Sequence, residues 1–182
     1  MSQKDIPSWI KNIYNNYMMM KGVNMSNIIE MTNLGIIKLV GIKARTNNQK
    51  EMTPGEGIIS PMIAKFHNMA SKIANRSDAS KFFCVYTEYD SDENGDYTYF
   101  VGAELSDFAD IADGFTTLTI PAQNYKKFAV GPGAMPMVCI NTWQDIWQNH
   151  KENRNYVADF EVYDGRSADP NNAELDIYIG MK

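Results

Sequence analysis

The sequence predicts an α+β protein in which one strand–helix–strand–strand unit occurs twice. Apolar residues make up 44% of the chain, which is enough for a hydrophobic core. Two blocks, about 35–105 and 115–182, show the same order of strand-like and helix-like patterns. The last strand-like segment of the first block, "YTYFVG", is similar to that of the second, "LDIYIG". The common order of the two blocks and the similarity of their last strands indicate an internal repeat with pseudo-twofold symmetry.

A repeat of this kind predicts an antiparallel sheet with the helices packed on one face. The other face would then be free to form a ligand groove where the two halves meet. Junctions between similar halves are common ligand sites.

The first block begins with an apolar, β-branched run at 35–46, which is typical of a strand. The link "TPGEG" precedes residues 58–75, where apolar residues recur at helical spacing. This stripe consists of Met62, Ile63, Phe66, Met69, Ala70 and Ile73. "KFFCVYTEYD" and "YTYFVGAEL" then have the composition of strands, and Asn94-Gly95 between them indicates a hairpin turn.

The second block repeats this order. Residues 115–131 are typical of extended chain with a break at Pro121. The segment "GPGAMP" separates this strand from a helix at 137–150, which carries Trp143 and Trp147. Two further strands, "ADFEVYD" and "ELDIYIGMK", complete the block.

Residues 1–24 form a separate N-terminal extension in this interpretation. Apolar residues recur there at helical spacing, at Ile6, Ile10, Ile13, Tyr17 and Met20. One short amphipathic helix is too small for a helix-turn-helix, which needs two helices and a turn. The domain itself would then span residues 25–182.

Charge and cysteine content limit the classes of partner. The net charge is −5, from 17 basic and 22 acidic residues, and no block of basic residues stands out, so we expect no direct nucleic-acid binding. No apolar run approaches the ~20 residues that span a bilayer, so we expect no membrane insertion. Cys84 and Cys139 lie far apart in apolar runs, which indicates buried thiols and a cytoplasmic location.

The sequence contains no complete motif for a metal site, a cofactor site or a catalytic nucleophile. "DSDENG" begins like a calcium loop, but Val101 stands where a bidentate glutamate is needed, so a hairpin turn is the better interpretation. His67 and His150 lack a His or Cys partner at metal-ligand spacing. "GPGAMP" lacks the Lys-Ser/Thr of a phosphate loop, and no Gly-x-Ser-x-Gly occurs. We therefore expect no metal, no cofactor and no classical catalytic nucleophile.

The strand "DFEVYD" carries the most informative polar residue. Successive strand residues point to opposite faces, so Phe160 and Val162 share one face while Glu161 and Tyr163 share the other. The polar face could be solvated or could line a cavity, and the pattern alone leaves both open. In a cavity the carboxylate would need a proton or hydrogen bonds, for example from a tyrosine hydroxyl. A carboxylate among aromatic rings attracts lipophilic cations.

Four ordered segments resemble the GyrI-like, AraC-type effector-binding family. They are "CVYTEYDSDENGDYTYFVGAEL", "IPAQNYKKFAVGPG", "TWQDIWQ" and "ADFEVYDGRSADPNNAELDIYIGMK". The resemblance covers about residues 25–182. It implies two strand–helix–strand–strand units with a ligand groove between them.

The resemblance also implies site residues. Glu161 matches the acidic residue that lies at the floor of the family's pocket and recognises cationic or hydrophobic ligands, and Tyr163 lies beside it. Trp143 matches the helix tryptophan, and Tyr86 the tyrosine of the "VYT" strand. The sequence does not fix whether Tyr86 and Trp143 face the groove or the core. The family often carries a DNA-binding helix-turn-helix, for which this chain has no room.

Three functions remain open at this stage. The first is a stand-alone sensor or sequestering protein for lipophilic, cationic small molecules. The second is a hydrolase of reactive small molecules that uses Glu161 as its acid or base, as some GyrI-like proteins imply. The third is an interaction module for a separate protein, such as DNA gyrase or a DNA-binding subunit, with the N-terminal helix as its docking face.

Overall fold

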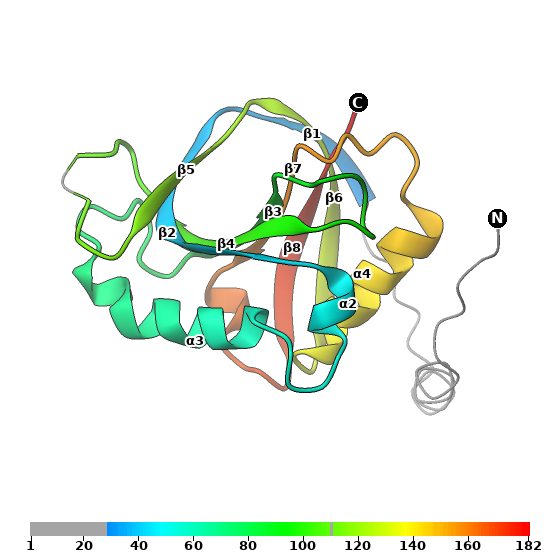
Figure 1. Cartoon of the computed structure of the whole chain (residues 1–182), viewed down its shortest axis with the longest axis horizontal. Helices are drawn as coiled ribbons and strands as arrows, with labels where there is room; N and C mark the ends of the chain where they lie inside the picture. The colour runs from blue at the N-terminus through cyan, green and yellow to red at the C-terminus, as the bar shows by residue number, and fades with distance from the viewer. Residues whose placement is uncertain (1–28, 110) are drawn as a thin grey trace.

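The computed structural model describes residues 29–109 and 111–182, and it shows one antiparallel sheet of eight strands with two main helices (Figure 1). The predicted helix at 6–20 lies outside the described residues. The strands are β1 (Ile29–Leu34), β2 (Ile37–Thr46), β3 (Phe82–Thr87), β4 (Tyr97–Glu104), β5 (Thr116–Ile120), β6 (Gln123–Gly133), β7 (Ala158–Tyr163) and β8 (Ala173–Gly180). The helices are α2 (Asn48–Glu51), α3 (Ile59–Met69) and α4 (Met137–Asn149), with 3-10 turns at Ala70–Lys72 and Gly165–Ser167.

The predicted repeat is confirmed by the strand order, β1-β6-β8-β7-β3-β4-β2-β5. In the first half β2, β4 and β3 lie side by side, and in the second half β6, β8 and β7 do so in the mirrored order. The halves join where β3 pairs with β7, with Cys84 opposite Glu161. The centre of the sheet is therefore also the junction of the two halves.

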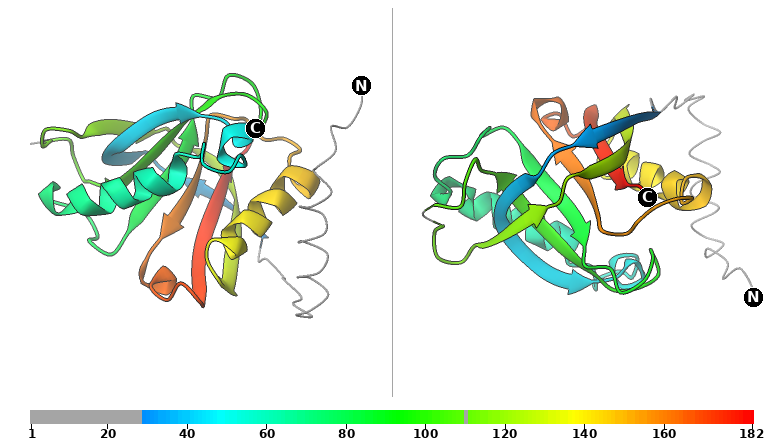
Figure 2. Two further views of the ribbon diagram at one scale, coloured as in Figure 1. Left: turned by 60° about the horizontal axis from the view of Figure 1, so that its bottom comes forward. Right: turned by 90° about the horizontal axis from the view of Figure 1, so that it is seen from above.

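The outer strands form a ribbon that the sequence did not indicate. β1 pairs with β6 and β2 pairs with β5, so the first extended segment of each half pairs with that of the other half. The register runs from Ile29 opposite Phe128 to Gly41 opposite Thr116 without a change of offset. In the right-hand view of Figure 2, the β1–β2 arm and the β5–β6 arm, which are paired with each other, lie in front of the central strands. The sheet therefore curls, and its edge strands cover its own far face.

Each face of the sheet packs into its own core. Both α3 and α4 pack on one face, as predicted, α3 on β2 and β4 and α4 on β6. The opposite face buries a second cluster beneath the ribbon: Leu39, Phe83, Val85, Phe100, Ile120, Tyr125, Ala158 and Phe160. That face is thus filled by side chains. The groove between the halves lies instead on the helix-bearing face, where the separated helices leave β3 and β7 accessible.

Helices α3 and α4 begin directly after the Pro/Gly-rich segments "TPGEG" and "GPGAMP", as the sequence predicts. α3 buries Met62 and Phe66, four residues apart, against the sheet. The Glu51 carboxylate, from the short α2, accepts hydrogen bonds from the backbone N–H groups of Ile58 and Ile59 and so caps α3. α3 ends at Met69 and a 3-10 turn follows, so the helix is shorter than the predicted 58–75. "GPGAMP" does convert β6 into α4.

The segment "DSDENG" lies in the connection between the antiparallel strands β3 and β4, as predicted. Asp90 N–H donates to Asp96 O, and Gly95 N–H donates to Asp92 O, which closes the turn.

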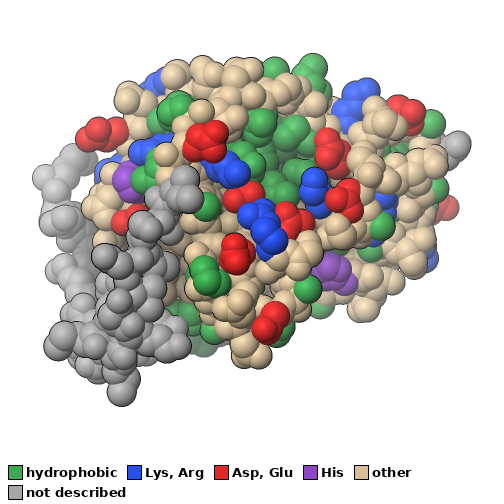
Figure 3. Space-filling model, turned by 180° about the vertical axis from the view of Figure 1, so that it is seen from behind, with side chains coloured by type: hydrophobic (Ala, Val, Ile, Leu, Met, Phe, Trp, Pro, Cys, Tyr) green, Lys and Arg blue, Asp and Glu red, His purple; other side chains and the backbone are tan. Residues whose placement is uncertain are grey.

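On the face of the molecule seen in Figure 3, basic and acidic side chains are interspersed. Among the described helices, none is both long and apolar enough to cross a membrane.

Candidate functional site

A pocket of about 580 Å³ opens between α3 and α4 over the centre of the sheet. Its walls come from Ile59 and Ile63 of α3 on one side and from Trp143 and Trp147 of α4 on the other. Side chains of β3, β4 and β7 form its floor. The volume lies within the range of small-molecule sites in proteins, about 300–1,000 Å³.

Glu161 lies at the floor of this pocket, 3% exposed and surrounded by donors. Its Oε1 accepts hydrogen bonds from Tyr86 OH at 2.8 Å, Trp143 Nε1 at 2.6 Å and Cys139 Sγ at 3.4 Å. Its Oε2 accepts one from Tyr163 OH at 2.8 Å. Among the described residues, no lysine, arginine or histidine forms an ion pair with it. The site is a buried carboxylate held by neutral donors.

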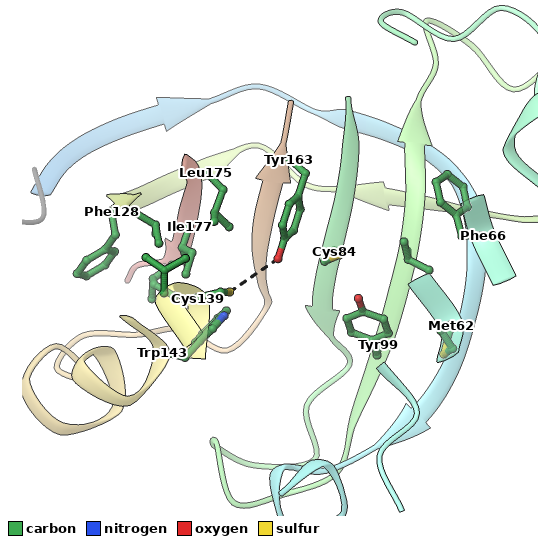
Figure 4. Close-up of a cluster of buried hydrophobic side chains, with 14 of the residues drawn as sticks. Met62, Phe66, Cys84, Tyr99, Phe128, Cys139, Trp143, Tyr163, Leu175 and Ile177 are labelled. Carbon is green, nitrogen blue, oxygen red and sulfur yellow. Dashed lines mark hydrogen bonds between the residues drawn. The ribbon is translucent and has the colours of Figure 1, made fainter. Parts of the chain in front are cut away.

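Local structure explains how these side chains meet. Alternation along β7 places Glu161 and Tyr163 on the helix side, and Phe160 on the ribbon side, as predicted. Cys139 and Trp143 are four residues apart on α4 and therefore point the same way. Figure 4 shows both side chains reaching from α4 toward Tyr163 on β7.

The donors keep their protons because they are buried beside a negative charge. Burial, followed by the charge of Glu161, raises the pKa of the Tyr86 and Tyr163 hydroxyls well above the usual value. The same two causes raise the pKa of the Cys84 and Cys139 thiols. Both cysteines are free and buried, as predicted. At neutral pH these groups act as hydrogen-bond donors rather than as nucleophiles.

Aromatic rings continue the wall on both sides of the carboxylate. Trp143 meets Tyr86 edge to face at 4.9 Å between ring centroids, and Trp147 lies 5.9 Å from Trp143. Tyr163 stacks on Phe82 at 4.5 Å. The structure thus places Tyr86 and Trp143 in the pocket wall, the point that the sequence left open. All four residues named from the sequence surround one cavity, while their role toward a ligand stays a prediction.

The sequence pattern did not indicate a second polar group that lies in the pocket. Arg154 lines the cavity together with Glu93 and Tyr89, and its Nη2 contacts Asp159 Oδ2 at 2.7 Å. Arg154 lies in the connection after α4, where no periodicity marks it. The sequence could have identified Asp159, because strand alternation puts it on the same face as Glu161.

Comparison with known proteins places this geometry in a family. A family model described as Cass2, integron-associated effector binding protein, matches residues 30–181. The chain belongs to the Cass2 family. The GyrI-like, effector-binding assignment made from the sequence segments is thereby confirmed, as is the α+β fold.

Relatives of this Cass2 family member include a curated protein and solved structures. The putative transcriptional regulator protein YobU of Bacillus subtilis (strain 168) is 29% identical over 155 residues, which cover 84% of this chain and 96% of YobU. The integron cassette protein from the mobile metagenome of Vibrio cholerae shares the fold, with a TM-score of 0.70 at 24% identity over 86% of this chain and 97% of its own. The protein SAV2435, solved bound to tetraphenylphosphonium, has a TM-score of 0.61 at 18% identity over 85% of this chain and 93% of its own.

Proposed function

We propose that this Cass2 family protein binds lipophilic, positively charged small molecules in the pocket between α3 and α4. The observation that carries the proposal is Glu161, a buried carboxylate with four hydrogen-bond donors but no cationic partner among the described residues, in an aromatic-walled cavity. The negative charge of such a site has no positive partner, and a cationic ligand can supply one. The binding of tetraphenylphosphonium by SAV2435 is consistent with the same ligand class.

The expected energies are large enough for micromolar binding. Because Glu161 is 3% exposed, the ligand cation would lie behind the rings of Tyr86 and Trp143 rather than on the carboxylate itself. At a separation of ~6 Å and an effective dielectric of ~20, the attraction is about 3 kcal/mol. Each ring facing the cation adds about 0.5–2 kcal/mol. The apolar walls contribute the remainder through burial of the ligand.

We further propose that the protein acts in the cytoplasm as a sensor or sequestering module. The relation to YobU, which is named a putative transcriptional regulator, supports a link to regulation. The match covers 96% of YobU, so the similarity extends over nearly the whole of that relative. An indirect regulatory role would pass through a separate protein partner.

Two ions of the same shape and opposite charge test the proposal. Tetraphenylphosphonium and tetraphenylborate are titrated against the wild type and Glu161→Gln, with tryptophan fluorescence as the signal because Trp143 and Trp147 line the pocket. We expect the wild type to prefer the phosphonium, and Glu161→Gln to bind it about 100-fold less tightly, as ~3 kcal/mol requires. Mass spectrometry of a hydrolysable cationic ester after incubation separates binding from turnover.

Glu152→Gln is the matched control, because Glu152 is exposed and lies outside the pocket lining. It removes the same charge from the chain and should leave both affinities unchanged. Equal affinity of the wild type and Glu161→Gln for tetraphenylphosphonium would remove Glu161 from the mechanism. A wild type that prefers the borate would overturn the proposal.

A further inference from the structure

Arg154 is a buried cation whose hydrogen bonds are incomplete. It is 2% exposed and lines the pocket. Its Nη2 donates to Asp159 Oδ2 at 2.7 Å, while Nε and Nη1 have no hydrogen-bond partner within the described parts of the chain. A buried donor left unpaired is costly, and a ligand acceptor that reaches it, once the side chains that cover it move aside, recovers that cost.

The charges around Arg154 restrict what that acceptor can be. Asp159 forms the close ion pair, and Glu93 Oε2 lies 3.8 Å from Nη1, too far for a hydrogen bond. The ring of Tyr156 lies 4.4 Å from the guanidinium carbon and covers one face of it. Two carboxylates thus already face one guanidinium. A ligand anion would be repelled by both carboxylates, whereas an uncharged oxygen would meet only the free donors.

Aromatic rings connect this end of the pocket with Glu161. Tyr86, which donates to Glu161, contacts Tyr97 at 5.5 Å between centroids. Tyr97 contacts Tyr89 at 5.6 Å, and Tyr89 contacts Tyr156 at 5.5 Å. Tyr89 OH also donates to Asp159 Oδ2 at 2.8 Å, which ties the last part of this wall to the Arg154 ion pair. Ring contacts therefore run without a break from the carboxylate to the guanidinium, and Tyr86, Tyr97 and Tyr89 among them line the pocket.

We propose that the pocket has a second recognition point at Arg154, which selects ligands that carry an uncharged oxygen acceptor, such as a ketone or amide carbonyl, at the end remote from their cationic group. This inference rests on the proposed function, because it takes Glu161 as the point that holds the cation. The ligand class is then an elongated lipophilic cation with a terminal carbonyl. A compact cation would use the Glu161 end alone.

Matched probes test this second point. Phenylalkyl trimethylammonium ions are prepared in a range of chain lengths, each ending in a methyl ketone or in the isosteric isopropenyl group. We expect the ketone of the best length to bind the wild type about tenfold tighter than its isopropenyl partner, as a hydrogen bond from a charged donor implies. In Arg154→Met the ratio should fall to about one. A third probe ending in a carboxylate should bind less tightly than the ketone.

Controls separate this inference from folding effects and from the proposed function. The double variant Arg154→Met/Asp159→Asn removes both charges of the close ion pair, so that Asp159 is not left as a buried carboxylate without its counter-charge, and it should show the same loss of preference. Because the result is a ratio of two probes on one protein, partial loss of folded protein does not change it. A ketone preference that survives in both variants, or that is absent in the wild type while tetraphenylphosphonium still binds, overturns this inference alone. Tightest binding of the carboxylate probe would contradict the selection of an uncharged acceptor at Arg154. Failure of every cation to bind would overturn the proposed function as well.

Discussion

Burial rather than distance should decide how much the two shortest ion pairs among the described residues contribute to stability. Arg154 and Asp159 are 2.7 Å apart with side chains 1% and 0% exposed. Arg45 and Asp90 are 2.6 Å apart with side chains 42% and 65% exposed. The two pairs have nearly the same contact distance in opposite environments.

Asp159→Ala leaves the buried Arg154 without its counter-charge. Asp159 also accepts hydrogen bonds from Tyr89 OH and from the backbone N–H of Gly180, both at 2.8 Å, and these donors lose their partner too. We expect a loss of about 3–5 kcal/mol in the free energy of unfolding. Asp90→Ala removes an exposed pair and should cost at most about 1 kcal/mol, because water solvates the remaining guanidinium.

Urea unfolding followed by tryptophan fluorescence measures both variants at one salt concentration. Equal slopes with urea would show that the midpoints can be compared as stabilities. Raising the salt should reduce the small effect of Asp90→Ala and leave that of Asp159→Ala nearly unchanged. The reasoning is refuted if the two variants lose the same stability, or if Asp159→Ala loses less than about 1 kcal/mol.

Two further predictions concern packing and pH. Gly41→Ala places a Cβ 2.0 Å from the backbone oxygen of Val101, so it should destabilise the protein by about 3 kcal/mol or more, whereas Gly35→Ala, with nothing within 4 Å, should stay within about 0.5 kcal/mol in the same unfolding assay. Tyr86 and Tyr163 have a pKa raised by burial and by Glu161, so their contribution is complete below the unfolded pKa of about 10 and is lost as the pH rises further, because the unfolded chain ionises first. The free energy of unfolding should therefore fall as the pH rises above about 10, and less steeply in Tyr86→Phe; an identical slope would contradict this cause.

The parts of the fold that the sequence predicts are those with strong periodicity. The stripe through Met62 and Phe66 identified α3, and alternation in "DFEVYD" correctly separated the two faces of β7. β1 was missed because most of its side chains are exposed and its pairing partner, β6, is far away in sequence. α2 was missed because four residues carry no helical period.

The position of the groove could not be obtained from local patterns. Which face stays open depends on the ribbon of β1–β2 and β5–β6, and this is a long-range pairing that fills the side opposite the helices. Arg154 is a similar case, because its contacts join a loop to residues of β7 and of the β3–β4 connection. Asp159, in contrast, follows from the same alternation that singled out Glu161.

The ribbon of β1–β2 and β5–β6 makes the two repeats depend on each other for folding. Each half sends its first arm to the edge of the other, so neither half has a complete sheet without its neighbour. These pairings join residues far apart in the chain, which favours slow and cooperative assembly over independent folding of the repeats. An arrangement in which two equivalent units exchange arms is also that of a domain-swapped dimer. The cavity, with one helix wall from each repeat, therefore resembles a cavity between two subunits, contained within a single chain.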